Sequence, residues 1–457
     1  METLERPISP EAAEEIRTCH PLVGDDWAQM SGRIPVEIET LAWETKALQR
    51  KREVKSALDL LRLVLAYSVC DWSLRLVGAW AMMIGLGSLS DVAVRKRLRN
   101  SLAWLGRIIG KWLQKRQEQL AGRAVCLRLI DASTASQPGS KGTDWRLHAK
   151  FDLGAFSMTG IEVTDASGGE SLKRHTAQKG EIDIADRGYA HRKGLGTIFA
   201  ARAYVVVRIT WQNLPLETAE GQKFDLMRWL RGQSRYPCET AVWMVTPAGR
   251  FEVRLAAQRL PEDKAEEARR RARKASRKKG RTPSKETLFA AGYILLVTNL
   301  PALTWTIEQV LALYRLRWQV ELLFKRLKGI LNLDRLRTKD PTLAQVYLLG
   351  KLVGALLLEE WTADLAAGEL AEWFEDAVRP VSPWRWMSLW TDLLRQAIRG
   401  PVTLSCVLAA LPCLARYLCD APRKRRQQAA CARQWLNAFA FPVEVFNPVD
   451  RHEFALA

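Results

Sequence analysis

The sequence predicts an α/β core flanked by helical regions. Helical periodicity fills residues 1 to about 120, returns after residue 306, and continues to the end of the chain. Between these regions, short apolar runs typical of strands alternate with short helical stretches, the pattern of an α/β core. We therefore expect a helical N-terminal region at 1–120, a core at 121–335 interrupted at about 211–290, and a helical C-terminal region at 336–457.

The composition indicates a folded and strongly basic protein. Of the 457 residues, 48% are hydrophobic, which argues against a disordered chain. The 69 Lys and Arg residues exceed the 50 Asp and Glu residues and give a formal net charge of +19. A balance of this sign favours polyanionic partners, with nucleic acid first and an anionic membrane surface second.

No segment favours membrane insertion or export. The best candidate, residues 60–83, is interrupted by Arg62, Asp71 and Arg75. The acidic N-terminus lacks the layout of a signal peptide, so we expect cytoplasmic residence and no membrane partner. None of the eight cysteines forms a C-x-x-C pair and the five histidines do not cluster, which argues against a zinc site. Any chemistry must therefore come from carboxylates.

The N-terminal region contains one segment with a basic end. Ser90 is a suitable N-cap for a helix over residues 91–113. This helix carries Arg95, Lys96 and Arg97 near its start and an apolar stripe after them. A buried face with a basic end suits contact with the DNA backbone, and an ordinary solvated helix has the same pattern. We keep both readings, and we name the three basic residues as candidate DNA contacts.

Apolar runs predict the strands of the core, and two of these runs end at an aspartate. The run at 124–130 ends at Asp131, and the run at 181–185 ends at Asp186, which Arg-Gly-Tyr follows. The full expected order is strands 124–130, 145–153 and 158–164, a short helix 171–178, strand 181–185, helix 194–202 and strand 204–209.

The interruption at about 211–290 contains strand-like runs at 240–246 and 251–256, before a strand at 293–298 resumes the core. It also carries nine positive charges within thirteen residues, from Arg269 to Arg281. A solvated helix or linker is the ordinary reading of a charge run, but this density favours a role at the DNA backbone. The candidate contacts are Arg270, Lys274 and Lys278, together with Arg208 in the core.

A long helix is predicted over residues 307–330, with Thr306 and Gln309 forming a capping box. Tyr314, Arg317, Glu321 and Lys328 follow one another at offsets of 0, 3, 7 and 14. At about 100° per residue, these four side chains lie within roughly 60° of one another. A separate apolar face, about 130° away, packs against the protein.

The polar face of this helix has the groups that phosphoryl transfer requires. A carboxylate such as Glu321 can hold a divalent metal, an arginine can clamp a phosphate, and lysine and tyrosine can bind further phosphate oxygens. A two-metal site needs about three carboxylates from different elements, and Asp131 and Asp186 can supply the other two. A solvent-facing helix surface is the ordinary alternative for the helix taken alone.

The spacing Tyr314-x-x-Arg317-x-x-x-Glu321-x-x-x-x-x-x-Lys328 resembles the Tyr-Arg-Glu-Lys signature of bacterial insertion-sequence transposases of the DDE superfamily, in the insertion-sequence-four family. The block from Ala185 to Tyr189 is also similar, and the Asp131 block is a weaker match. The resemblance covers roughly residues 85–335, and both ends of the chain match only in helical character.

The resemblance implies a ribonuclease-H-like core with a β-rich insertion between the second Asp and the Glu. It implies Mg²⁺ dependence, with two ions per site and Mn²⁺ as a substitute, binding to terminal inverted repeats of double-stranded DNA, and a homodimer that joins two ends. Asp131, Asp186 and Glu321 would bind the metal, and Tyr314, Arg317 and Lys328 would hold DNA phosphates. The C-terminal region would contribute to dimerisation and DNA contact.

Asp183 is a rival to Asp186, because it lies three residues earlier in the same strand. Strand alternation places the two side chains on opposite faces, and the Asp-Arg-Gly-Tyr context favours Asp186. For function, the leading hypothesis is an active transposase that nicks DNA and transfers strands. The alternatives are a stand-alone metal-dependent nuclease and a catalytically silent, transposase-derived DNA-binding protein.

Overall fold

The computed structural model describes residues 26–120, 126–368, 371–372 and 381–402, and a few positions between 407 and 417. Residues up to Val402 belong to one compact unit, and the rest of the chain forms a second. The first 25 residues and most of the predicted C-terminal helical region beyond residue 402 lie outside the described residues.

Residues 26–120, the described part of the N-terminal region, form helices. Its helices are α2 (Asp26–Ser31), α3 (Ile38–Glu44), α4 (Ala57–Ser68), α5 (Leu74–Met83), α6 (Asp91–Asn100) and α7 (Leu102–Leu120). Ser90 caps α6 by accepting a hydrogen bond from the Ala93 N–H. The single helix expected over 91–113 is wrong, because Ser101 ends α6 and turns its hydroxyl back to the Arg97 carbonyl.

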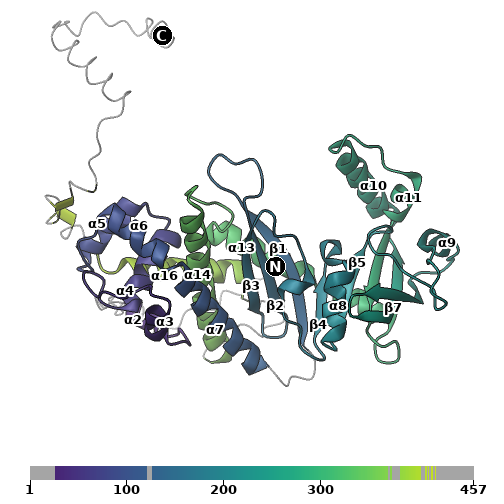
Figure 1. The fold of residues 1–457 in the computed structure, drawn as a ribbon, viewed down its shortest axis with the longest axis horizontal. Helices are drawn as coiled ribbons and strands as arrows, with labels where there is room; N and C mark the ends of the chain where they lie inside the picture. The colour runs from purple at the N-terminus through teal and green to yellow at the C-terminus, as the bar shows by residue number, and fades with distance from the viewer. Residues whose placement is uncertain are drawn as a thin grey trace, which may run out of the picture. The chain divides into compact units, whose positions relative to one another are not determined.

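One eight-stranded sheet forms the centre of the protein, in the order β3-β2-β1-β4-β5-β8-β7-β6 (Figure 1). The core strands are β1 (Leu127–Ala135), β2 (Trp145–Asp152), β3 (Ser157–Asp165), β4 (Ile182–Ala185) and β5 (Tyr204–Ile209). The first three pair antiparallel, and β4 and β5 continue parallel to β1. This order and these directions are those of a ribonuclease-H-like core. The predicted end of the first strand at Asp131 is wrong, since β1 runs on to Ala135.

Short helices connect the core strands. The 3₁₀ turn η1 (Leu172–Arg174) is the short helix predicted at 171–178, and η2 (Arg187–Tyr189) follows β4 directly. The helix α8 (Arg192–Ala200) then leads to β5. Because β4 is followed at once by η2, Asp186 lies at the carboxyl end of a parallel strand, where ligands of α/β sheets bind.

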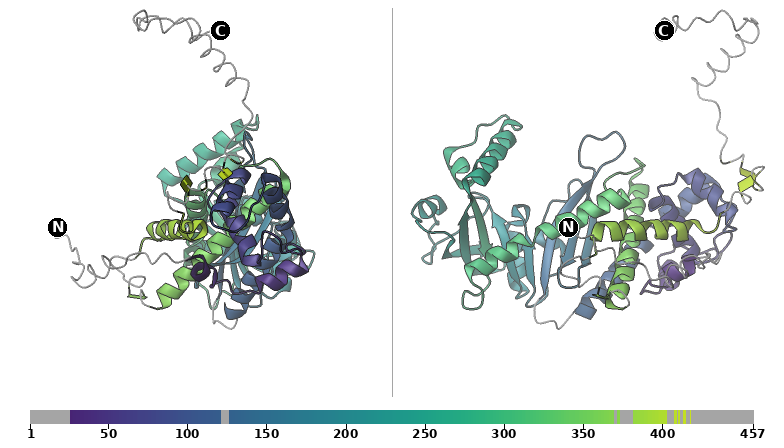
Figure 2. Two further views of the ribbon diagram at one scale, coloured as in Figure 1. Left: turned by 90° about the vertical axis from the view of Figure 1, so that its left-hand side faces the viewer. Right: turned by 180° about the vertical axis from the view of Figure 1, so that it is seen from behind.

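The insertion extends the core sheet. Strands β6 (Cys238–Thr246) and β7 (Gly249–Arg259) form a hairpin, and β7 pairs with β8 (Tyr293–Thr298), which pairs with β5. The helix α9 (Leu226–Arg231) precedes the hairpin. Helices α10 (Glu262–Arg277) and α11 (Lys285–Ala290) connect β7 to β8 and project beyond the strands (Figures 1 and 2).

The helix predicted at 307–330 is two helices, α12 (Ile307–Arg315) and α13 (Trp318–Leu331). The Thr306 and Gln309 capping box is confirmed. Around Leu316 and Arg317 the chain changes to tighter i→i−3 hydrogen bonds, while Arg317 keeps helical dihedral angles. The polar face therefore continues from α12 into α13 despite the break.

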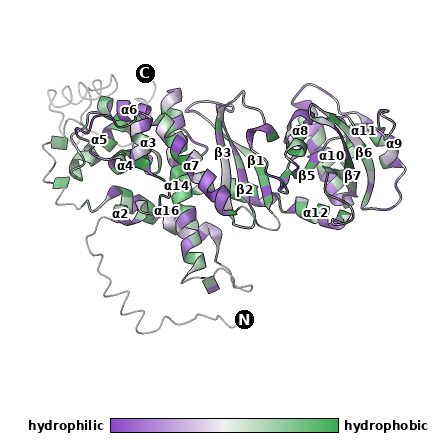
Figure 3. Ribbon diagram, turned by 60° about the horizontal axis from the view of Figure 1, so that its bottom comes forward, coloured by the Kyte–Doolittle hydropathy of each residue, from purple (hydrophilic) through white to green (hydrophobic). Residues whose placement is uncertain are grey.

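The described part of the C-terminal region includes the helices α14 (Pro341–Ala367) and α16 (Pro383–Arg399). By length and composition α14 could cross a membrane, but 78% of its most apolar window is buried inside the protein. It packs against α4 and α7 and belongs to the hydrophobic core (Figure 3). We therefore interpret its apolar sequence as that of a core helix.

Candidate active site

Asp131 lies in the middle of β1, on the face of the sheet that packs against the helices α13 and α14. One of its carboxylate oxygens accepts a hydrogen bond of 2.8 Å from the Ala132 N–H. Burial raises the pKa of Asp131 to about 6, although the Ala132 N–H and the Arg317 guanidinium lower it. The charged form of this carboxylate therefore needs a nearby cation.

Asp186 follows β4 and accepts a hydrogen bond of 3.1 Å from the Tyr314 hydroxyl. Burial and the negative charge of Asp186 together raise the pKa of Tyr314 to about 12, while Arg208 on β5 opposes this. The contact ties α12 to the end of β4. It brings a residue of the Tyr-Arg-Glu-Lys pattern to the second aspartate.

Arg317 links the other two carboxylates. Its Nη2 lies 2.5 Å from Glu321 Oε1, and its Nη1 lies 3.6 Å from Asp131 Oδ2. Burial lowers the pKa of Arg317, but the hydrogen bond to Glu321 and the charges of its neighbours raise it above its usual value. The guanidinium is therefore a fixed positive charge between a strand carboxylate and a helix carboxylate.

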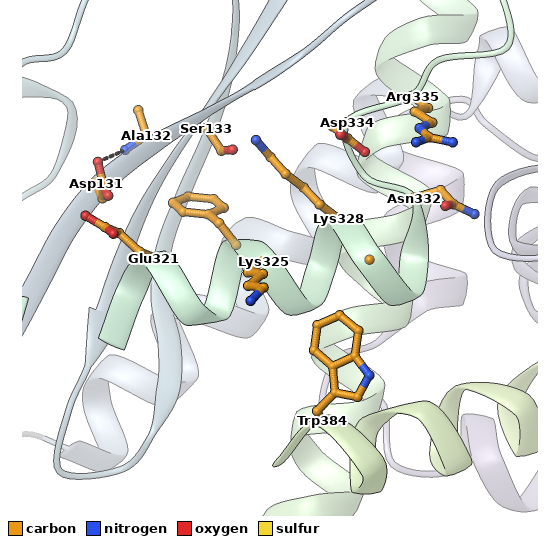
Figure 4. Close-up of a pocket in the computed structure, with 12 residues that line it drawn as sticks. Asp131, Ala132, Ser133, Glu321, Lys325, Lys328, Asn332, Asp334, Arg335 and Trp384 are labelled. Atoms are coloured by element: carbon orange, nitrogen blue, oxygen red, sulfur yellow. Dashed lines mark hydrogen bonds between the residues drawn. The ribbon is translucent and has the colours of Figure 1, made fainter. Parts of the chain in front are cut away.

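These contacts bring five of the six residues of the predicted site together, from β1, β4, α12 and α13. The sixth, Lys328, lies further along α13 and lines the same groove of about 750 Å³ as Asp131 and Glu321 (Figure 4). Asp186 does not line this groove. The packing of α13 on β1 and the contact of α12 with the end of β4 explain how residues almost 200 positions apart in the sequence meet on one face of the sheet.

The three carboxylates offer only oxygen donors, which suits a hard divalent cation such as Mg²⁺. Among the residues that the structure describes, no three His, Cys, Asp or Glu side chains are close enough to hold an ion together. Arg317 and Tyr314 bind these carboxylates instead. Because burial raises the pKa of Asp131, its charged form is stabilised by a nearby positive charge, which a metal ion would supply. The oxygen donors and the electrostatics of the site therefore both fit a divalent metal.

Asp183 lies on the opposite face of the sheet from Asp131. It is fully buried beside Lys150, with 3.4 Å between Lys150 Nζ and Asp183 Oδ1. Burial raises the pKa of Asp183 against the effect of Lys150. A carboxylate enclosed in this way is a component of the core, and the placement favours Asp186 at the site.

The basic residues near the start of α6 lie apart from the carboxylates. Arg95 forms an ion pair of 3.0 Å with Asp340, and Arg97 donates to the Arg50 carbonyl at 3.3 Å. Lys96 is exposed. Asp340 is the N-cap of α14, so Arg95 has a structural contact that the sequence did not indicate.

The basic run of the insertion lies on α10 and its C-terminal end. Arg270, Lys274 and Lys278 are exposed and recur every four residues, so they share one face. Their neighbours Arg269, Arg271 and Arg273 instead pair with glutamates of the same helix at 2.5 to 3.3 Å.

Two further residues lie near the site that were not predicted as site residues, although Tyr189 belongs to the block that carries the resemblance. The Glu170 carboxylate lies against the backbone of Gly188, so that a side chain there would collide with it. The Tyr189 hydroxyl is buried without a hydrogen-bond partner among the described residues, and burial, with Asp131 and Glu170 nearby, raises its pKa. No spacing signal marks Glu170, because only the fold brings its loop to the β4 end.

The sheet order and the carboxylate-bearing elements define the class of ribonuclease-H-like proteins. The family model described as "Transposase DDE domain" matches residues 124–358. The chain therefore belongs to the DDE transposase family, as the Tyr-Arg-Glu-Lys resemblance predicted. Membership implies dependence on a divalent metal.

Curated relatives place the chain among the transposases of bacterial insertion sequences. It is 40% identical over 348 residues to "Putative transposase InsL for insertion sequence element IS186A" of Escherichia coli K12, covering 74% of this chain and 94% of that protein. It is also 40% identical to the IS421 transposase of Escherichia coli, with the same shares covered. The IS231F transposase of Bacillus thuringiensis subsp. israelensis is 25% identical, covering 71% of this chain and 76% of its own length.

Among solved structures, the chain is similar to a piggyBac transposase synaptic complex with hairpin DNA, at 9% identity and a TM-score of 0.44. The match covers 94% of this chain and 93% of that one.

Proposed function

We propose that this transposase cuts double-stranded DNA at the terminal inverted repeats of its own insertion sequence and joins the 3′ ends to target DNA. Asp131, Asp186 and Glu321 would hold two Mg²⁺ ions, for which Mn²⁺ can substitute. The observation that carries the proposal is that a single arginine contacts carboxylates from β1 and α13, while Tyr314 contacts the one after β4.

The chain's own residues would then position the DNA. Arg317 holds the carboxylates in place without DNA and can turn its guanidinium to a phosphate, which it binds with two parallel hydrogen bonds. Tyr314 and Lys328 supply a hydroxyl and an ammonium group to neighbouring phosphate oxygens. When bound, the divalent metal would activate the attacking oxygen and stabilise the leaving oxygen.

The proposed partners follow from charge and from the reaction. Two element ends must be held together, so we propose a homodimer in the complex with DNA. Arg208 beside the site and the exposed face of α10 with Arg270, Lys274 and Lys278 would contact the DNA backbone, and the basic start of α6 would add to it. Work on chromosomal DNA would place the protein at the bacterial nucleoid.

The test is cleavage of a labelled duplex that carries the terminal repeat of the protein's own element, with Mg²⁺ present. We expect wild-type protein to nick at the repeat boundary and Glu321→Ala to bind the duplex without nicking it. Loss of a group that supports developing charge typically costs about 10²–10³-fold in rate.

Glu308→Ala is the matched control, because Glu308 is an exposed carboxylate on the neighbouring helix α12. It should nick at the wild-type rate. Binding without nicking by the wild type would support the silent DNA-binding alternative. Nicking by Glu321→Ala would show that the wrong carboxylate is assigned, and nicking without joining would favour a nuclease.

A further inference from the structure

The groove beside Asp131 and Glu321 continues along α13 and ends at Trp384 (Figure 4). Its far wall is the turn after α13, where Asp334 and Leu336 form backbone hydrogen bonds with Ser136 beyond the end of β1. The groove is therefore enclosed by β1, α13, this turn and the first turn of α16. Of the six predicted site residues, Lys328 lines the part of the groove that lies beyond the carboxylates.

Three cations line the groove beyond the carboxylates: Lys325, Lys328 and Arg335. Lys325 and Arg335 are exposed, and Lys328 is half-buried. Within the described part of the chain, none of the three has a carboxylate at ion-pair distance, whereas most arginines of α10 have one. Unpaired cations in a row suit a polyanion such as a nucleic-acid backbone.

The edge of the Trp384 indole ring packs against Gly329. The ring atoms nearest to the position of a Gly329 Cβ are Cη2, Cζ2 and Cζ3, which form the outer edge of the six-membered ring. The side chain is 42% exposed, and none of the described aromatic rings stacks on it. An indole that rests on its edge can turn a face to a planar partner, and glycine is the residue that allows this approach.

We propose that the groove from Glu321 to Trp384 binds a single DNA strand with unpaired bases next to the cleavage site, and that Trp384 stacks on one of these bases. A basic groove with an aromatic platform is the chemistry that binds single-stranded nucleic acid. The proposal rests on the proposed function, since it concerns DNA at the same site.

The length of α13 between Glu321 and Gly329 also predicts which base reaches the indole. Gly329 follows Glu321 by eight residues in the same helix, a distance of about 12 Å along its axis. One strand of stacked DNA advances about 3.4 Å per nucleotide. The base on Trp384 therefore lies about three or four nucleotides from the scissile phosphate.

The experiment compares two duplexes that carry the element's terminal repeat, one flush and one with an unpaired extension of about four nucleotides. Full-length protein is titrated with each in EDTA, so that no cleavage occurs. Wild-type protein should bind the extended duplex more tightly. Trp384→Ala should lose about five- to a hundred-fold in affinity for it and little for the flush duplex, because stacking on an aromatic ring is removed.

Three further variants make the result specific. Trp384→Phe should keep most of the gain, and Trp43→Ala, which removes a 69% exposed tryptophan of α3, should keep all of it. Gly329→Ala keeps the indole but displaces its edge, so it should lose the gain in part.

A fluorescent 2-aminopurine scanned along the extension gives a second readout. Its quenching should be strongest about three or four nucleotides from the cut and should disappear in Trp384→Ala. The inference is overturned if wild-type protein gains nothing from the extension or if Trp384→Ala keeps the gain. The cleavage test with Glu321→Ala is unaffected by either result, so the two proposals fail separately.

Discussion

His175 is a buried histidine on the side of the sheet away from the three carboxylates of the site. It is 7% exposed and lies beside a cluster of buried charges in which Lys150 pairs with Glu181 and Asp183. Burial, together with the neighbouring charges of Lys150 and His148, lowers the pKa of His175 to about 3. The folded protein therefore keeps this imidazole neutral.

The pKa of His175 is lower in the folded protein than in the unfolded chain, and this difference predicts that the folded protein loses stability in acid. An unfolded histidine titrates near 6.5, so between about pH 6.5 and pH 3 the unfolded chain binds a proton that folded His175 does not. Its contribution to stability is present above pH 6.5 and is lost as the pH falls. We expect the free energy of unfolding to drop by about 2 kcal/mol at pH 5 for this residue, and His175→Gln to remove that part of the drop.

Urea unfolding at pH 7 and pH 5 measures this change. His191→Gln is the control, because His191 is exposed at the start of α8. A His175→Gln variant that loses as much stability between the two pH values as the wild type would contradict the prediction.

At the scale of elements, the packing of α14 on α4 depends on two glycines. A Cβ at Gly350 would lie 2.9 Å from both Ser68 Cβ and Val64 Cγ1, and a Cβ at Gly354 would lie 2.9 Å from Val69 Cγ2. Such distances require the neighbours to move, and the neighbours belong to a buried helix. The close approach of the two helices therefore excludes larger residues.

Gly350→Ala should destabilise the protein by about 1 to 3 kcal/mol, because it overpacks a well-packed helix interface. Gly106→Ala is the matched control, since Gly106 is exposed on α7 with no atom within 4 Å of its Cβ position. It should stabilise the protein by about 0.5 to 1 kcal/mol through helix propensity. Thermal unfolding of both variants checks the pair, and a Gly350→Ala variant as stable as the wild type would refute the overpacking.

The elements also show how far the sequence could predict the structure. Apolar runs located the core strands, because buried strands leave a continuous hydrophobic signal. The break near Arg317 left no signal, since its dihedral angles stay helical and the periodicity continues across it. The end of β1 was misjudged because Ser133 and Thr134 are polar residues inside a strand.

The candidate site was predictable where its residues share a helix or follow a strand. The Tyr-Arg-Glu-Lys spacing predicted the four site residues on one face of the helix. The two aspartates associated with strands were the other two predicted site residues. Glu170 and Trp384 could not be found in this way, because a loop and a distant helix bring them to the site only in the folded chain.

At the scale of the whole molecule, the positive charges behind the net charge of +19 differ in whether a carboxylate already neutralises them. Some cations, such as Arg271 and Arg273, are neutralised by glutamates of α10, and others, such as Lys274 and Lys278, are exposed without an ion pair among the described residues. Only the second group is available to release counterions from DNA.

Changing both Lys274 and Lys278 to Ala should therefore reduce the slope of log K against log salt by about two, close to 0.9 per phosphate contact. Changing both Arg271 and Arg273 to Ala should alter the slope less, although it removes the same charge. Salt titration of duplex binding measures both slopes. If the two double variants gave equal slopes of log K against log salt, the DNA contacts would have to lie elsewhere on the protein.

The connection between β7 and β8 has a consequence for how such proteins diverge. Arg259 and Tyr293 are register partners in adjacent antiparallel strands, so the chain leaves the sheet at residue 260 and returns at residue 292 to the neighbouring position. A hairpin turn of about two to five residues would close the same ladder. The pairing of β7 with β8 therefore does not require helices α10 and α11, and we expect that a short turn in their place would leave the strands that carry the carboxylates unchanged.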